Sequence, residues 1–262
     1  MSEPHVLYEV KKDIAIIMLN RPEAKNRFSP EMITLWREHL EEARADNDIR
    51  VIVVTGKGDT FCSGANIADL ADGKLRLWDM KKYLWEGIQR IALCLEDLDK
   101  PIIAAINGAA MGAGMDMAIM CDLRVCSDRA KLSESYVNLG EVPGDGGAYF
   151  LPRLVGVSKA LELLFTGDDI NPQEALELGL VNRVVPHDRL MDETIIMAEK
   201  IARKPPLAIR MIKRAVYQAQ TGTLRSHLDY ISSQAALLSG TQDHHEAAKA
   251  FLEKRKPKFI GK

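Results

Sequence analysis

Short runs of apolar residues alternate with amphipathic stretches along the first third of the chain. Val6–Val10 and Ile14–Leu19 have the composition of strands, and the polar segment Lys11–Asp13 between them predicts a turn. Three further apolar runs are continuous, as in strands that are buried on both faces. These runs are Val51–Thr55, Ile102–Ile106 and Leu123–Cys126.

Helices are expected between and after these strands. Ser29 is a good N-cap, Pro30 suits the first helical position, and Glu31 complements the positive end of the helix dipole. A long helix is expected over about residues 78–98, and the chain becomes largely helical from about residue 157 onward. This alternation predicts an α/β fold in which helical crossovers join parallel strands.

Residues 101–120 form a nearly uncharged segment that could be mistaken for a membrane span. Pro101, Asn107, three later glycines and Asp116 interrupt it, which disfavours a continuous spanning helix. We therefore expect a buried strand, a tight glycine-rich turn and a buried helix here, and no association with a membrane.

Composition narrows the class of protein. The 262 residues are 47% hydrophobic and 27% charged, with a formal net charge of −2, so no nucleic-acid partner is expected. The four cysteines form no CxxC pair and have no histidine cluster at zinc-ligand spacing, which predicts free thiols and no metal site. Free thiols and an N-terminus without the pattern of a secretory signal predict a cytoplasmic protein.

Two turns that contain glycine stand out as candidate ligand sites, at Phe61–Asn66 and at Asn107–Gly114. Small residues allow the backbone to approach a ligand, and the second turn aims free N–H groups from a helix N-terminus. One N–H from each turn could polarise a thioester carbonyl and stabilise an enolate. Alternatively, the glycines only permit tight packing of strand against helix. The second turn does not fit the GxGxxG pattern of dinucleotide-binding folds.

These turns belong to a set of motifs that resembles the enoyl-CoA hydratase/isomerase family, also called the crotonase family. The motifs occur in family order and with family spacing over nearly the whole chain. They are Asn20-Arg21-Pro22 with Asn26, Phe61–Ile67, Lys100-Pro101, Ala105–Gly108, Gly112–Asp116, Cys121-Asp122, Pro143–Gly147 and Ala175–Val181.

The resemblance implies a right-handed ββα spiral in residues 1–199, which holds the CoA site and the active site. Residues 200–262 are implied to form a helical trimerisation region, and their sequence predicts two or three amphipathic helices. The implied assembly is a homotrimer or a hexamer made of two trimers. No separate cofactor is implied, because coenzyme A is part of the acyl-CoA substrate.

The resemblance also assigns site residues. It implies that Ala65 and Ala113 supply the two N–H groups of an oxyanion hole. It further implies contacts with CoA or substrate around the first turn, and a C-terminal tail that covers the nucleotide of a neighbouring subunit. The residues concerned are Arg27, Ser63, Gly64, Ala65, Asn66, Ile67, Gly112, Phe251 and Lys254.

Two glutamates that flank the substrate double bond in typical hydratases are replaced here. The first position falls on Asp116, a shorter carboxylate, which could instead be an acid stabilised by a helix dipole. The second falls on Tyr136, which can donate a proton but is a poor base with a usual pKa near 10. It could equally be a wall of the pocket.

Other acids lie close by in the sequence. Asp145 stands one place past the position where some isomerases of the family carry their acid, and it could alternatively cap the next helix. Glu134 would share a face with Tyr136 if both lay in a strand, and Glu141 follows in the next loop.

The favoured function is hydratase-type lyase chemistry on an α,β-unsaturated acyl-CoA, with Asp116 handling water or a proton. Alternatives are an enoyl-CoA isomerase, a thioester hydrolase and a non-catalytic acyl-CoA-binding homologue. The sequence does not identify the acyl group. Met, Leu and Trp side chains around residues 70–86 could line its pocket or simply form a helix core.

Overall fold

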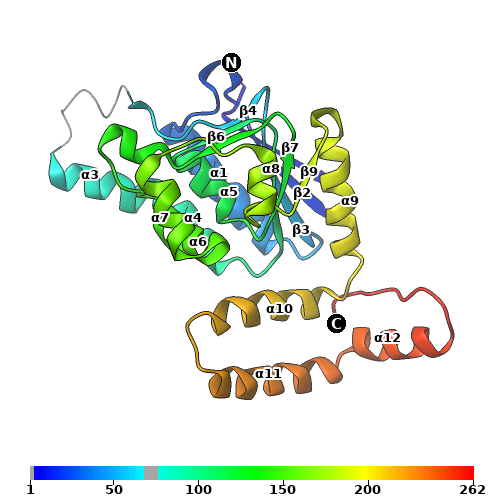
Figure 1. The fold of residues 1–262 in the computed structure, drawn as a ribbon. Coiled ribbons are helices and arrows are strands. Elements are labelled where there is room, and N and C mark those ends of the chain that lie inside the picture. The colour runs from blue at the N-terminus through cyan, green and yellow to red at the C-terminus, as the bar shows by residue number, and fades with distance from the viewer. Residues whose placement is uncertain (1–2, 68–75) are drawn as a thin grey trace.

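The structure, a computed structural model, describes residues 3–67 and 76–262 and is built around a six-stranded sheet (Figure 1). The strand order is β1-β2-β3-β5-β7-β9; β1 and β2 are antiparallel, and each later pair is parallel. All five predicted strands are present, with ends shifted by at most one residue. The strands are β1 (Val6–Lys11), β2 (Ile14–Leu19), β3 (Val51–Gly56), β5 (Ile102–Ile106), β7 (Leu123–Ser127) and β9 (Arg183–Val185).

A second, smaller sheet contains β4 (Thr60–Cys62), β6 (Ala109–Met111) and β8 (Lys131–Ser133), all parallel. The chain adds one strand to the large sheet, then one to the small sheet, and then returns through helices. This sequence of strands occurs three times, as β3 and β4, as β5 and β6, and as β7 and β8. The predicted α/β spiral is therefore confirmed.

Helices cover the large sheet on both faces. The first helix, α1 (Pro30–Ala45), begins as predicted, because the Ser29 side chain accepts a hydrogen bond from the Met32 N–H at 3.1 Å. The long helix expected over residues 78–98 is present as α3 (Leu77–Tyr83) and α4 (Gln89–Asp97), joined by the π-helical turn η2 (Leu84–Ile88). Gly87 has non-helical backbone angles in this turn, so the helix is kinked there.

The remaining elements before the C-terminal region are short. The expected buried strand and buried helix at residues 101–120 are confirmed, but the expected turn between them contains the short strand β6. The part of the chain that the structure describes contains no helix able to span a membrane. The helices are α5 (Ala113–Ile119), α6 (Gly147–Val155), α7 (Val157–Thr166), α8 (Pro172–Glu177) and α9 (Leu190–Ala202), with 3-10 turns η1 (Pro22–Ala24), η3 (Ser135–Leu139) and η4 (His187–Arg189).

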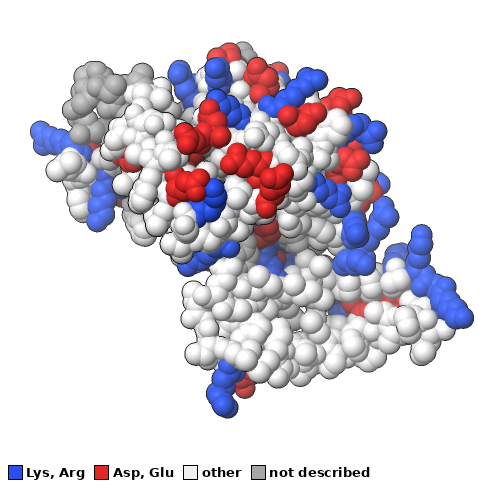
Figure 2. Space-filling model, viewed as in Figure 1, with Lys and Arg blue, Asp and Glu red and all other residues white. Residues whose placement is uncertain are grey.

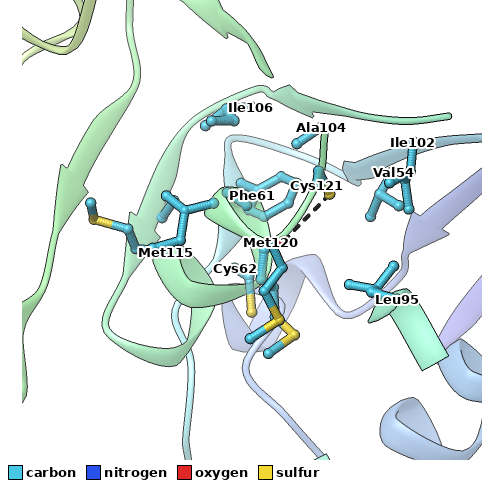
Figure 3. Packing of buried hydrophobic residues seen from close by; sticks show 14 of the residues in the cluster. Val54, Phe61, Cys62, Leu95, Ile102, Ala104, Ile106, Met115, Met120 and Cys121 are labelled. Carbon is cyan, nitrogen blue, oxygen red and sulfur yellow. Dashed lines mark hydrogen bonds between the residues drawn. The ribbon is translucent and has the colours of Figure 1, made fainter. Parts of the chain in front are cut away.

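Alternate residues of the large sheet enter two separate cores. Ile16, Val53 and Ile103 pack with apolar residues of α9 on one face. Val54 and Ile102 point to the other face, where they meet the small sheet and α5. Figure 3 shows part of this second core, which includes Phe61, Cys62, Met115 and Met120. Neighbouring residues such as Val53 and Val54 enter different cores, because successive side chains of a strand point to opposite faces of the sheet.

The last three helices form a C-terminal arm that projects from the rest of the chain: α10 (Pro206–Ala219), α11 (Leu224–Ser239) and α12 (Gln242–Leu252) (Figure 1). Asp122 anchors α10, because it lies 2.8 Å from the Lys213 ammonium and accepts a hydrogen bond from the Tyr217 hydroxyl at 2.9 Å. The predicted boundary after residue 199 lies near the end of α9 and stays a prediction.

The C-terminal arm leaves much of its apolar surface uncovered. Leu228 and Leu237 of α11 are 53% and 62% exposed, and Ile212 of α10 is 57% exposed. Figure 2 shows that the visible face of the arm carries few charged side chains along most of its length. Such a surface is typical of a region that contacts another subunit.

Candidate active site

The two glycine-containing turns lie against each other. Gly64 has a positive φ of 77°, and a β-carbon there would stand 2.9 Å from the Met111 carbonyl oxygen and 3.2 Å from the Ala113 nitrogen. Gly114 is packed against the backbone of Cys62, with no room for a side chain. The glycines therefore allow close packing, and this packing brings the backbones at Ala65 and Ala113 to one place.

Two backbone donors point to a shared site. Ala113 is the first residue of α5, so its N–H lies among the helix N-terminal donors that have no partner within the helix. Within the described residues, no hydrogen bond is found from the backbone N–H of Ala65 or of Ala113 to a turn, loop or side-chain acceptor. Both residues line one cavity of about 160 Å³. This geometry fits the predicted oxyanion hole.

The cavity contains several of the residues predicted to contact substrate. Ser63, Ile67 and Gly112 line it beside the two alanines. Met80 and Leu84 also line it, which partly supports the expectation that residues around 70–86 form an acyl pocket. Trp78 and Trp85 are 71% and 52% exposed. Residues 70–75 of that expectation lie outside the described residues.

Other predicted contacts lie away from this cavity. Arg27 is exposed and Asn66 is half-buried, and neither is among the cavity-lining residues. Phe251 belongs to α12 and Lys254 follows it, so both lie in the C-terminal arm, apart from the cavity of their own chain (Figure 1). Their predicted contact with a neighbouring subunit's nucleotide stays a prediction.

Tyr136 joins two carboxylates at the inner end of the cavity. Its hydroxyl donates a hydrogen bond to Oδ2 of Asp116 at 2.7 Å and lies 3.3 Å from Oδ2 of Asp145. Tyr136 and Asp145 line the cavity, whereas Asp116 is completely buried and does not. The structure therefore brings the three predicted catalytic residues together, with Asp116 behind the phenol.

Two local expectations about this cluster are wrong. Tyr136 and Glu134 do not share the face of a strand, because β8 ends at Ser133 and Tyr136 lies in η3. Asp145 does not cap α6, because Gly146, with a φ of 127°, is the residue before its first turn. A glycine there frees the Asp145 side chain to turn toward Tyr136.

Glu134 is a member of the cluster that motif comparison did not assign. It is fully buried, and both of its carboxylate oxygens lack a hydrogen-bond partner among the described residues. In the sequence, Glu134 stands out only as an acid two positions before Tyr136, and no local pattern predicts its burial next to Asp116.

Burial dominates the electrostatics of these groups. It raises the pKa of Asp116, and the hydrogen bond from Tyr136 lowers that pKa part of the way back. Burial and the charge of Asp116 together raise the pKa of Asp145 to about 7 and raise that of Glu134 further. The same two effects raise the pKa of Tyr136, so its phenol is a proton donor and not a base.

Comparison with known proteins identifies the family and agrees with the fold. The sequence profile of the enoyl-CoA hydratase/isomerase family matches residues 9–262. A crotonyl-CoA hydratase of Syntrophomonas wolfei is 35% identical over 263 residues, covering 100% of both chains. A 1,2-epoxyphenylacetyl-CoA isomerase of Escherichia coli is 33% identical, covering 98% of each chain. The crystal structure of an enoyl-CoA hydratase from Bacillus anthracis has a TM-score of 0.94 and 33% identity, covering 98% of this chain and 100% of that chain.

Proposed function

We propose, from the premise that this chain belongs to the enoyl-CoA hydratase/isomerase family, that it adds water to an α,β-unsaturated acyl-CoA. Family membership, with relatives named as hydratases and as an isomerase, supports activity of the hydratase or isomerase type. The addition of water, and thus the lyase class, is the finer proposal. It is supported chiefly by two carboxyls that one phenol joins beside a pair of backbone donors.

The thioester oxygen would bind between the N–H groups of Ala65 and Ala113. Withdrawal of electrons by these donors makes the β-carbon electrophilic and stabilises the enolate that forms when water adds. Because both residues line the cavity that Tyr136 and Asp145 also line, the reacting carbons would lie between the donors and the acids.

Asp145 is the acid that would meet substrate directly. The water oxygen bonds to the β-carbon as one water proton passes to the Asp145 carboxylate, and the α-carbon of the enolate then takes a proton back from Asp145. One water is added, and the acids return to their starting protonation. Tyr136 connects Asp145 to Asp116, so a proton taken up by Asp145 can be shared with the buried carboxyl before it returns to the substrate. Asp116 would act through Tyr136, because it does not line the cavity.

A double-bond isomerase is the second candidate, and one observation favours it. Of the three buried acids around Tyr136 (Asp116, Glu134 and Asp145), Asp145 alone lines the cavity. The other acid that lines it, Glu141, is exposed. A single carboxyl suffices to move a proton from one carbon to another, so an isomerase needs no second acid at the substrate. The E. coli relative is named as an isomerase, although of an epoxide substrate.

Mass spectrometry separates these candidates. The protein is incubated with straight-chain, branched, alicyclic and aryl enoyl-CoAs, with Asp145→Asn as the matched inactive control. A product heavier by one water supports the proposal. A product of unchanged mass with a moved double bond supports the isomerase, and release of free CoA indicates a thioester hydrolase. Binding of the panel without turnover of any member would contradict an enzymatic function.

The proposal also includes the assembly of subunits and the contacts that cover bound CoA. The exposed apolar side chains of the C-terminal arm would pack against other subunits in a homotrimer or in a pair of trimers. Phe251, 83% exposed, and Lys254 would then lie over the nucleotide of CoA bound to a neighbouring chain. Arg27 and Asn66, near the first turn, would contact the same CoA from the chain that binds it.

A further inference from the structure

Two buried carboxyls converge above Gly147. A β-carbon at Gly147 would stand 2.9 Å and 3.1 Å from the two carboxyl oxygens of Glu134, and closer still to Oδ1 of Asp116. Both acids are fully buried, and they come from different elements, since Asp116 lies in α5 and Glu134 follows β8. The absence of a side chain at Gly147 is what leaves room for both groups.

The hydrogen bonds around Asp116 are incomplete on the side that faces Glu134. Oδ2 of Asp116 accepts the Tyr136 hydroxyl, but Oδ1 has no partner among the described residues. The Glu134 carboxyl and, to a smaller extent, the backbone N–H groups of Gly147 and Asp145 lie close enough to lower the Asp116 pKa, but none of them completes a hydrogen bond to Oδ1. Both oxygens of Glu134 also lack partners.

The groups around Asp116 and Glu134 require that the two carboxyls share one proton. The ionisable groups that face Asp116 are Tyr136 from η3, Asp145 from the turn before α6, and Glu134. Within the described residues, no lysine, arginine or histidine forms an ion pair with these acids. Two adjacent buried carboxylates without a cation cannot both stay ionised, so the pair shares a proton.

We infer that Glu134 is a positioning residue, held as a neutral carboxylic acid whose O–H donates to Oδ1 of Asp116. This inference rests on the proposed function, because it gives Glu134 a part in the same acid–base reaction. This hydrogen bond supplies Oδ1 of Asp116 with the donor that it lacks, and it gives one of the buried Glu134 oxygens a partner. Asp116 then accepts two donors, one from Glu134 and one from Tyr136, which fixes the phenol beside Asp145.

The proton belongs on Glu134 rather than on Asp116 for a physical reason. Tyr136 already donates to Asp116, and this hydrogen bond favours the ionised carboxylate. Glu134 has no such donor, and burial and then the negative charge of Asp116 oppose its ionisation, so its pKa is raised above that of Asp116. A neutral Glu134 thus keeps Asp116 ionised at neutral pH.

Two substitutions test whether Glu134 acts as a donor. Glu134→Gln keeps a donor, because its amide N–H₂ can replace the carboxylic O–H, whereas Glu134→Leu removes it. Loss of the donor disfavours the ionised form of Asp116. In Glu134→Leu, the fall of kcat/KM at low pH should therefore begin at a higher pH than in the wild type; this fall is the acid limb of the pH profile. The expected shift is about one to two pH units, the size expected from one hydrogen bond to a charged group. Glu134→Gln should keep the wild-type limb.

The result that overturns the inference is an acid limb at the same pH in all three proteins, or an equal shift in both variants. If the Leu variant does not fold, Gly147→Ala replaces it as the variant that breaks the contact. Gly147→Ala is a matched probe of the same contact, because its added methyl group would separate the two carboxyls. It should shift the limb in the same direction as Glu134→Leu.

A second measurement does not depend on turnover. Difference infrared spectroscopy of the wild type, at a pH above the Asp145 pKa of about 7, should show the C=O stretch of one protonated buried carboxyl. This band should disappear in Glu134→Gln and persist in Asp145→Asn. A wild-type protein without the band would overturn the inference even if hydration is confirmed. A band without any turnover of enoyl-CoAs would instead count against the proposed function alone.

Discussion

The hydroxyl of Tyr136 donates to Oδ2 of Asp116 at 2.7 Å and lies 3.3 Å from Oδ2 of Asp145, so one phenol links a buried acid to an acid on the cavity surface. This link explains how a chain with a tyrosine at the second glutamate position can still carry two carboxyls for proton transfer. The second carboxyl comes from the turn that precedes α6, nine residues later in the chain.

Tyr136→Phe removes the hydroxyl and keeps the ring. Asp116 then loses the donor that favours its ionised form and its connection to Asp145, so kcat should fall about 10²-fold with little change in CoA-ester affinity. Steady-state kinetics and equilibrium binding of a CoA ester measure the two effects. A loss below a few-fold would mean that the phenol only lines the pocket and that Asp145 acts without Asp116.

The buried acids make stability depend on pH. Burial raises the pKa of Asp145 from 3.8 to about 7, so the folded chain binds a proton that the unfolded chain has released. The stability from this proton is fully present below the unfolded pKa and is lost as pH rises through about 7. In Asp145→Asn, the free energy of unfolding should therefore fall less steeply with pH across this window.

Chemical denaturation at several pH values measures this slope. Asp168→Asn, at an exposed position outside the cluster, is the matched control and should keep the wild-type slope. Identical slopes in the wild type and in Asp145→Asn would show that Asp145 is not held protonated by burial.

The C-terminal arm should hold the assembly together. Replacing both Leu228 and Leu237 by Glu puts charges on exposed apolar positions of α11, so trimers should dissociate at micromolar concentration. Light scattering coupled to size-exclusion chromatography measures the mass. Val10→Glu alters an exposed apolar side chain of β1 outside the arm and should leave the mass unchanged. A wild-type protein that is only monomeric would contradict the proposed assembly.

CoA thioesters should stabilise the folded chain. A ligand that binds only the native state raises the melting temperature in proportion to its concentration relative to its dissociation constant. The N–H groups of Ala65 and Ala113 provide the expected contact with the thioester oxygen. Differential scanning fluorimetry should show a rise with acyl-CoA. A rise with NAD or a nucleoside triphosphate, and none with CoA esters, would be inconsistent with the site described here.

The sequence predicted the strands well because their signal is local. Continuous apolar runs such as Val51–Thr55 and Ile102–Ile106 can be satisfied only where both faces are covered, and the large sheet provides that environment. The helix start at Ser29 was equally local, since its capping side chain and the capped N–H lie three residues apart. The kink at Gly87 was not predicted, because it interrupts an otherwise regular helical pattern.

The acid cluster was only partly predictable, because it depends on contacts between distant segments. Motif positions identified Asp116 and Tyr136, but their hydrogen bond joins residues 20 positions apart on different elements. The burial of Glu134 beside Asp116 requires the open space above Gly147, which no local pattern indicates. The 3-10 turn at Ser135–Leu139 also replaced the strand that would have placed Glu134 and Tyr136 on one face.

The most direct test of the account is hydration of the true enoyl-CoA substrate by Asp116→Asn and Asp145→Asn. Each substitution keeps size and polarity but removes proton exchange at one end of the Tyr136 link. General acid–base groups contribute about 10²–10⁴-fold, so kcat should fall by that order in both variants while CoA-ester affinity stays close to wild type. Near-normal turnover by Asp145→Asn, or by Asp116→Asn, would contradict the proposal that the two carboxyls act together.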